Sequence, residues 1–138
     1  MRPIELKIKG INSYREEQVI NFNQLTSQGF FGIFGPTGSG KSTILDAITL
    51  ALYAKLPRGS KNFININETS ASVSFHFSIT TTETKEYLVE RSFRYPGKDR
   101  SSTARNTTAR LSLLSDIDTE VLADKPTDVT RSCIDLLG

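Results

Sequence analysis

The sequence is poor in the residues that build covalent cross-links and zinc sites. It contains one cysteine, Cys133, and one histidine, His76, in 138 residues. A single cysteine excludes an internal disulfide framework and any metal site of the CxxC type. One cysteine and one histidine are also too few for a zinc site built from several ligands of these two kinds. We expect Cys133 to be a small core residue and His76 to be a solvated residue on the polar face of a strand.

Long apolar runs are missing as well. No stretch approaches the roughly 18 consecutive apolar residues of a transmembrane helix. The first ten residues, MRPIELKIKG, alternate in charge where a signal peptide requires an apolar segment. The length is that of one domain. We therefore expect residues 1–138 to form a single cytoplasmic domain that is neither secreted nor bound to a membrane.

The net charge of +2 is small, but the charges are unevenly distributed along the chain. Residues 91–110 carry six basic side chains and one acidic side chain, whereas residues 116–138 carry six acidic and two basic ones. A basic cluster of this kind indicates a nucleic-acid partner. The alternative is a solubilising loop at an edge of the sheet. The predicted DNA contacts are Arg94, Lys98, Arg100 and Arg105.

Hydrophobic periodicity predicts a mixed α/β fold. Apolar and polar residues alternate over 4–9, and a second short run over 18–22 is expected to pair back on the first through a turn at 10–14. The continuous apolar run 29–34 is typical of a strand covered on both faces. Further strands are expected over 72–79, 87–93, 109–114 and 120–122, a polar loop over 96–108, a buried helix over 42–54 and a second helix over 126–137.

A glycine-rich segment lies between the strand expected at 29–34 and the buried helix. Its residues Gly35, Pro36, Thr37, Gly38, Ser39, Gly40, Lys41 and Ser42 match the P-loop pattern G-x-x-x-x-G-K-[ST] at every fixed position. Glycines let the backbone approach a phosphate, and the N–H groups that open a helix attract its charge. Lys41 would reach the β- and γ-phosphates, Ser42 would bind Mg²⁺, and Thr43 would contact the α-phosphate. The alternative is a chance glycine turn before a helix.

Several parts of a complete P-loop NTPase are absent from the sequence. Such enzymes need an acidic residue that holds Mg²⁺ and activates water, placed after an apolar strand. The nearest candidate is Asp116, which follows Leu111–Leu114, but Ser112 and Ser115 interrupt the apolar run. The sequence contains no NKxD and no LSGG-like segment, and its three glutamines all precede the P-loop. No complete catalytic set is therefore present in this chain.

The chain resembles the N-terminal ATPase lobe of the SbcC family, the ATPase subunits of SbcCD exonucleases within the SMC and ABC-type ATPase superfamily. The resemblance covers essentially the whole chain and is carried by the hairpin at 4–22, by GPTGSGKSTILDAITLALYAKLPRG at 35–59, and by 71–77 and 87–93. It implies an α/β P-loop NTPase fold with antiparallel strands of a mixed sheet around the P-loop strand and a buried helix.

The resemblance also implies cofactors, partners and further site residues. In this family the head is split, so the chain would be a fragment of a larger protein that binds ATP and Mg²⁺. The implied partners are the C-terminal lobe of the same parent chain, a second head in a homodimer, an SbcD-like metallo-phosphoesterase nuclease, and DNA at the nucleoid. Asn12 and Ser13 lie where family members touch the nucleoside, and Asn65–Asn67 would border the adenine. The alternative for Asn12 and Ser13 is ordinary turn chemistry.

Three functions remain open at this point. The first is one lobe of a DNA-repair ATPase whose head closure gates an associated nuclease, of SbcC type or of the related RecF or SMC type. The second is a self-contained small P-loop kinase, and the third is a module that binds nucleotide without catalysis. Because the acidic strand is missing, we expect the chain alone to be inactive as an ATPase.

Overall fold

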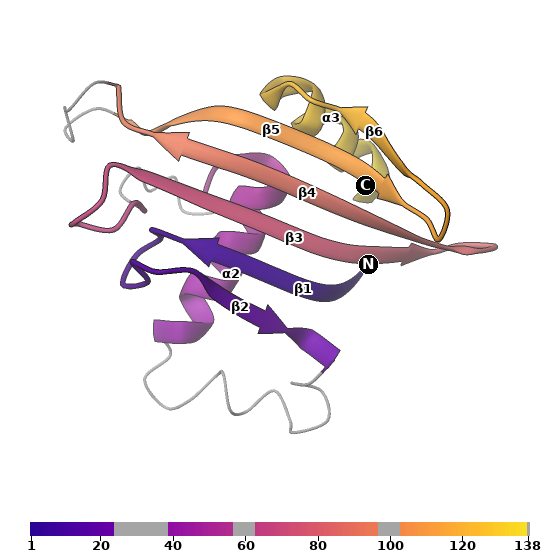
Figure 1. Cartoon of the computed structure of the whole chain (residues 1–138), viewed down its shortest axis with the longest axis horizontal. Coiled ribbons are helices and arrows are strands. Elements are labelled where there is room, and N and C mark those ends of the chain that lie inside the picture. The colour runs from indigo at the N-terminus through magenta and orange to yellow at the C-terminus, as the bar shows by residue number, and fades with distance from the viewer. Residues whose placement is uncertain (24–38, 57–62, 97–102, 138) are drawn as a thin grey trace.

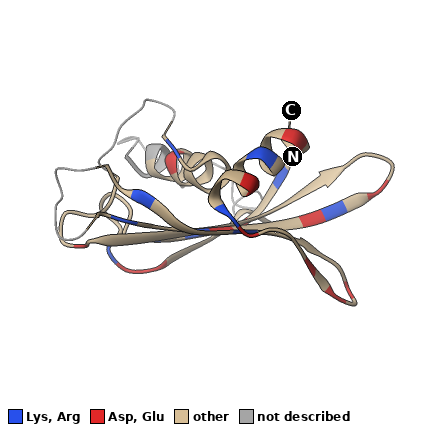
Figure 2. Ribbon diagram, turned by 90° about the horizontal axis from the view of Figure 1, so that it is seen from above, with Lys and Arg blue, Asp and Glu red and all other residues tan. Residues whose placement is uncertain are grey.

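The computed structural model describes residues 1–23, 39–56, 63–96 and 103–137. In this part of the chain, six strands form one sheet of order β2-β1-β3-β4-β5-β6, and each neighbouring pair is antiparallel (Figure 1). Both described helices lie on the same face of the sheet (Figure 2). The elements are β1 (Arg2–Lys9), β2 (Gln18–Asn21), α2 (Ser39–Tyr53), β3 (Ser70–Thr80), β4 (Thr84–Arg94), β5 (Arg105–Leu114), β6 (Thr119–Ala123) and α3 (Pro126–Leu137).

The α/β class and the antiparallel strands predicted from periodicity are confirmed. The strand expected over 29–34 lies outside the described residues. The prediction of a polar loop over 96–108 is wrong at its C-terminal boundary, because β5 begins at Arg105 and pairs there with Arg94 of β4. Neither α2 nor α3, the helices of the described part of the chain, has the length and hydropathy of a membrane span.

The core lies between the sheet and the two helices. Along β3 the apolar side chains of Val73, Phe75 and Phe77 are buried, while the polar residues between them are more accessible, as the alternation predicted. Phe77 stacks on Phe75 at 5.3 Å and on Tyr87 at 5.6 Å between ring centroids. Each such pair adds about 0.5–1.5 kcal/mol beyond the burial of its area. The aromatic row therefore fixes the position of β3 against β4.

Helix α2 is buried through its alanines and leucines. Ala47, Leu50 and Ala51 have no exposed surface, as expected for an Ala- and Leu-rich helix that packs on a sheet. The chain leaves the helix through Ala54, which adopts a left-handed conformation with φ of 63° and donates its N–H to Leu50 O at 2.9 Å. This geometry ends the helix but leaves later carbonyls in need of donors.

Arg91 supplies donors to these carbonyls and is itself buried, with 2% of its surface exposed. It occupies an inward position of β4 between Val89 and Phe93. Arginine carries five N–H donors in a planar fork. Here the Nε–H donates to Ala51 O at 2.6 Å, Nη2 to Leu52 O at 3.0 Å and Thr130 Oγ1 at 2.9 Å, and Nη1 to Asn106 Oδ1 at 2.8 Å and Pro126 O at 3.2 Å.

These contacts correct the sequence interpretation of the basic cluster at 91–110. The charge count includes Arg91 among the basic residues available to a nucleic acid, but its side chain points into the core. Burial lowers the pKa of its guanidinium. Its charge is compensated by the C-terminal carbonyls of α2, which carry the negative end of the helix dipole. Arg91 thus joins the end of α2 to the start of α3 and to β5.

Cys133 lies one turn along α3 from Val129, and both side chains are fully buried. The prediction that this cysteine is a core residue is confirmed. Burial raises the pKa of the Cys133 thiol to about 11, and the nearby Arg91 opposes part of that increase. The thiol is therefore neutral at physiological pH and behaves as a small apolar group.

Replacing Arg91 is expected to destabilise the fold strongly. Arg91→Met removes the guanidinium donors to the carbonyls of Ala51 and Leu52 at the end of α2, and unpaired buried acceptors cost about 1–3 kcal/mol each. We expect a loss of roughly 3 kcal/mol or more in the free energy of unfolding, measured by urea denaturation. The matched control is Arg110→Met on the exposed face of β5, which should change stability by less than about 0.5 kcal/mol. Equal losses in the two variants would contradict the assigned role.

Stability should also fall at alkaline pH because of Cys133. Its folded pKa of about 11 lies above the ordinary thiol value of 9.0, so its contribution is complete below pH 9 and is lost as pH rises toward 11. The measurement is the free energy of unfolding between pH 8 and 11 for wild type and Cys133→Ala. The wild-type curve should fall more steeply, and parallel curves would contradict the prediction.

Candidate functional site

The turn that follows β1 has a backbone that few residues accept. Gly10 has φ of 73°, and a Cβ at this position would lie 2.5 Å from Ser70 O, so only glycine fits against β3. Ile11 and Tyr14 close the turn through N–H to O contacts of 3.1 and 2.9 Å. Asn12, between them, also has a positive φ of 50°, which asparagine tolerates better than most residues.

A distant segment at 63–67 is fastened to this turn. The N–H of Asn12 donates to Phe63 O at 2.7 Å, and the N–H of Asn65 donates to Gly10 O at 2.8 Å. The Asn65 side chain, which is buried, donates from Nδ2 to Asn12 O at 2.7 Å and accepts the N–H of Asn67 at 2.9 Å. Asn65 thus holds the turn and the segment as one unit.

The same turn contacts the first turns of α2. The side-chain amide of Asn12 donates to Thr43 Oγ1 at 3.3 Å, and Thr43 is 5% exposed. The structure therefore brings together three sets of residues that the sequence links to a nucleotide: Asn12, Thr43 and the 65–67 segment. They meet where α2 begins, and the N-terminus of a helix favours anionic groups.

The remaining predicted site residues have different placements. Gly35, Pro36, Thr37 and Gly38 lie outside the described residues, as do Lys98 and Arg100. Ser39, Gly40, Lys41 and Ser42 form the start of α2 in the backbone trace. Ser13 is exposed on the turn beside Asn12. Arg94 and Arg105 are exposed and stand opposite each other on β4 and β5.

Two acidic residues, Asp46 and Asp116, have very different positions relative to this site. Asp46, one turn beyond Ser42 on α2, is 8% exposed. Asp116 follows β5 beyond Leu114, which pairs with Glu86 near the β3–β4 turn. The candidate site lies at the other end of the sheet, where Lys9 pairs with Ser72 of β3. Asp116 is therefore at the wrong end of the sheet to act on a group bound near Thr43.

His76 has a partner that the sequence did not reveal. Its Nε2 lies 3.0 Å from Glu86 Oε1 across the β3–β4 pair, on the face without helices. The interpretation of His76 as a polar-face strand residue is confirmed, but its imidazole is only partly solvated, with 25% of the side chain exposed. The pair lies at the end of β4 remote from Asn12.

Comparison with known proteins supports the resemblance noted from the motifs. The family model described as AAA domain matches residues 5–132. The SbcC component of the nuclease SbcCD from Clostridium acetobutylicum is 48% identical over 138 residues, and that from Bacillus subtilis is 48% identical over 141 residues. Both alignments cover the whole chain, which spans only 12% of the length of each relative. The probable DNA double-strand break repair Rad50 ATPase of Aquifex aeolicus is 41% identical over 68% of the chain and 10% of its own length.

Two variants of Asn12 separate its backbone role from its side-chain role. Asn12→Gly removes the amide but accepts the positive φ, whereas Asn12→Ala loses the amide and adds left-handed strain of about 1 kcal/mol. We expect Asn12→Ala to be the less stable variant by about that amount in urea denaturation. If the amide also contributes to ligand binding, both variants will weaken nucleotide affinity equally. Equal stability of the two would contradict the strain argument.

Proposed function

The chain belongs to the AAA domain family, and on that premise we propose that it is the ATP-binding lobe of a split ABC-type ATPase head that acts on DNA. The observation that carries the proposal is the junction of the P-loop pattern at 35–42 with the start of α2, where Asn12, Thr43 and Asn65 converge. Two SbcC proteins are 48% identical over alignments that cover the whole chain, and this similarity supports the choice of this ATPase class.

The donor set at this junction suits a triphosphate. The opening N–H groups of α2 would face the phosphates, Lys41 would neutralise the β- and γ-phosphates, and the Thr43 hydroxyl would lie near the α-phosphate. Ser42 would hold Mg²⁺, which when bound neutralises charge between the β- and γ-phosphates. Asn12 positions Thr43 through the 3.3 Å contact, and Asn65 fixes Asn12. In this proposal, Asn12, Ser13 and Asn65–Asn67 border the nucleoside.

Hydrolysis by this lobe would require residues from elsewhere. Asp116, the nearest candidate for a catalytic carboxylate, follows the end of β5 that is remote from Thr43. We propose that the acidic Mg²⁺ site and the signature motif come from the C-terminal lobe of the same parent and from a second head. Two heads would then close around two nucleotides and gate an SbcD-like metallo-phosphoesterase nuclease. A self-contained kinase would need its own carboxylate beside the phosphates.

Binding and turnover of ATP-Mg²⁺ test this proposal directly. The chain should bind a fluorescent ATP analogue and release no phosphate, and Lys41→Ala should weaken binding at least tenfold because the main phosphate cation is lost. The matched control is Lys85→Ala, an exposed lysine beside Glu83 at the far end of β4, which should bind as wild type does. Phosphate release by the chain alone would contradict the split head and favour a self-contained NTPase or kinase.

A further inference from the structure

Strand β6 (Thr119–Ala123) forms one edge of the sheet (Figure 1). In the described part of the chain it pairs with β5 on one side, and no strand pairs with its other side. An edge strand presents a row of unpaired backbone N–H and C=O groups, which can pair with another extended chain. Lysine and proline are common protections of such an edge, and β6 contains neither. The edge at β6 is therefore open to a further strand.

The hairpin between β5 and β6 shows which backbone groups of β6 point outward. Ser115 donates its N–H to Asp118 O at 3.0 Å, so these two residues are a hydrogen-bonded pair. Hydrogen-bonded and non-hydrogen-bonded pairs alternate along an antiparallel ladder, so Glu120 belongs to the next hydrogen-bonded pair, and Thr119 and Val121 do not. The N–H of Thr119 accordingly donates to the side chain of Asp118, at 2.7 Å from Oδ1. The N–H and C=O of Val121 therefore point away from β5.

Three apolar side chains near this edge are accessible to solvent. Ile117, in the turn between β5 and β6, is 97% exposed, and Val121 and Leu122 are 50% and 42% exposed. The register between β5 and β6 shifts at this point, so Leu122 has no facing residue on β5. Exposed apolar groups that lie close together mark surfaces where another molecule binds.

The same hairpin is strongly acidic. Residues 116–124 include four acidic side chains and no basic one. All four are exposed, and within the described ranges none of them makes an ion pair. They are Asp116, Asp118, Glu120 and Asp124. Carboxylates placed around an open edge attract a basic partner and repel a polyanion.

We propose that β6 binds an extended segment of a partner protein in which basic and apolar residues alternate. The segment adds to the sheet as a further strand beside β6 and pairs with the outward N–H and C=O of Val121. Its basic side chains meet the carboxylates of the hairpin, and its apolar side chains cover Val121 and Leu122. In this mode of recognition, main-chain hydrogen bonds provide affinity and alternate side chains provide specificity.

A second copy of this chain is a poorer occupant of the edge. Two β6 strands paired antiparallel about Val121 would place Asp118 of each copy opposite Asp124 of the other. Like charges at facing positions destabilise a sheet. The charge of the hairpin therefore favours a basic segment from a different protein.

The binding test uses the protein at its natural length and a fluorescein-labelled peptide of about nine residues, long enough to span a typical strand, in which lysine and valine alternate. Fluorescence anisotropy gives the affinity. A second peptide has the same sequence but is methylated on every backbone nitrogen. It keeps the positive charge and has no N–H donor, so it cannot complete the ladder of a sheet.

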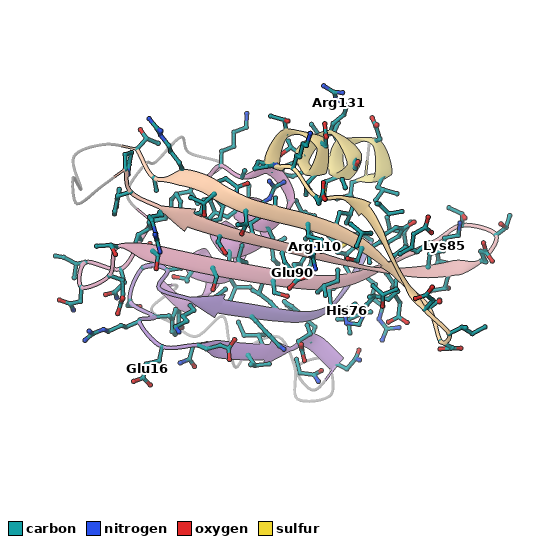
Figure 3. All side chains as sticks on the ribbon, turned by 45° about the horizontal axis from the view of Figure 1, so that its top comes forward. Glu16, His76, Lys85, Glu90, Arg110 and Arg131 are labelled. Carbon is teal, nitrogen blue, oxygen red and sulfur yellow. The ribbon has the colours of Figure 1, made fainter. Side chains whose placement is uncertain are left out.

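Two variants with matched controls test the two parts of the surface. Val121→Pro removes the outward N–H at a position where an edge strand accepts proline, and Val121→Thr keeps that N–H and the branched shape of the side chain. The double variant Glu120→Lys with Asp124→Lys reverses the charge of the hairpin. Its control is Glu16→Lys with Glu17→Lys, two exposed residues before β2 at the opposite edge of the sheet (Figure 3). Thermal melting and binding of a fluorescent ATP analogue are measured on the same samples.

The wild-type protein should bind the lysine–valine peptide and not its methylated form. Val121→Pro should lower the affinity by about tenfold or more, because a carbonyl of the bound segment is left without its donor. Val121→Thr should stay within about threefold of wild type because it keeps the N–H. The hairpin reversal should lower the affinity by about fivefold at roughly 50 mM salt and by less at roughly 500 mM, because salt screens exposed charges. The control reversal should leave the affinity within about twofold of wild type.

Equal binding of the two peptides would overturn the inference, since charge alone would then explain the attraction. Absence of binding, or equal affinities of Val121→Pro and Val121→Thr, would do the same. Sedimentation that shows self-association of wild type, abolished in Val121→Pro, would make a second copy the occupant instead. The turn between β5 and β6 lies at the end of the sheet remote from Thr43, so ATP affinity should be the same in all of these variants. The result is therefore independent of the proposed function.

Discussion

The burial of the Arg91 guanidinium is the constraint on which the arrangement of the helices depends. A charged group in the core is tolerated only when its donors are satisfied. The guanidinium donates five hydrogen bonds, to acceptors on α2, α3 and β5. Moving either helix would break at least two of these bonds and leave a buried charge unpaired. Arg91 therefore sets where α2 ends, and through the rigid helix it sets where α2 begins.

This constraint connects the core to the proposed nucleotide site. The carbonyl groups at the C-terminus of α2 accept hydrogen bonds from Arg91, and the N-terminus of α2 lies toward the predicted phosphate position. Its 15 residues span about 22 Å at 1.5 Å per residue. A positive guanidinium at the C-terminus stabilises the helix dipole, whose positive end is the part that would attract phosphate. The turn at Gly10 to Asn12 then fixes the other end of α2 against β1 through the contact between Asn12 and Thr43.

Much of this architecture could be predicted from the sequence, and the failures have identifiable causes. Alternation located β1, β3 and β4, and the stripe at Val129 and Cys133 located α3, because one face of each element is buried. The charge count at 91–110 wrongly included Arg91 among the accessible basic residues, because it ignored which strand face each residue occupies. Arg91 occupies the same face of β4 as the apolar residues Tyr87, Val89 and Phe93. This alternation in the sequence indicates that its side chain points inward.

The parts of the candidate site that belong to a sequence motif could be predicted, whereas the parts that depend on long-range contacts between segments could not. The P-loop pattern indicates a phosphate site by itself, and the resemblance pointed to Asn12 and Asn65. No sequence rule places Asn65 on the Gly10 and Asn12 carbonyls, because that contact spans more than 50 positions and depends on the register of β1 with β3.

Strand direction also determines which end of the sheet each terminal residue reaches. The sheet is antiparallel throughout its described part, so successive strands terminate at opposite ends of the sheet. Only alternate strands therefore place their last residue at the end where the candidate site lies. β5 runs away from that end and carries Asp116 with it, while β4 runs toward it and ends in Arg94. Within the described residues, β5 therefore places Asp116 away from Thr43, and for this reason the proposed function takes the catalytic carboxylate from outside this chain.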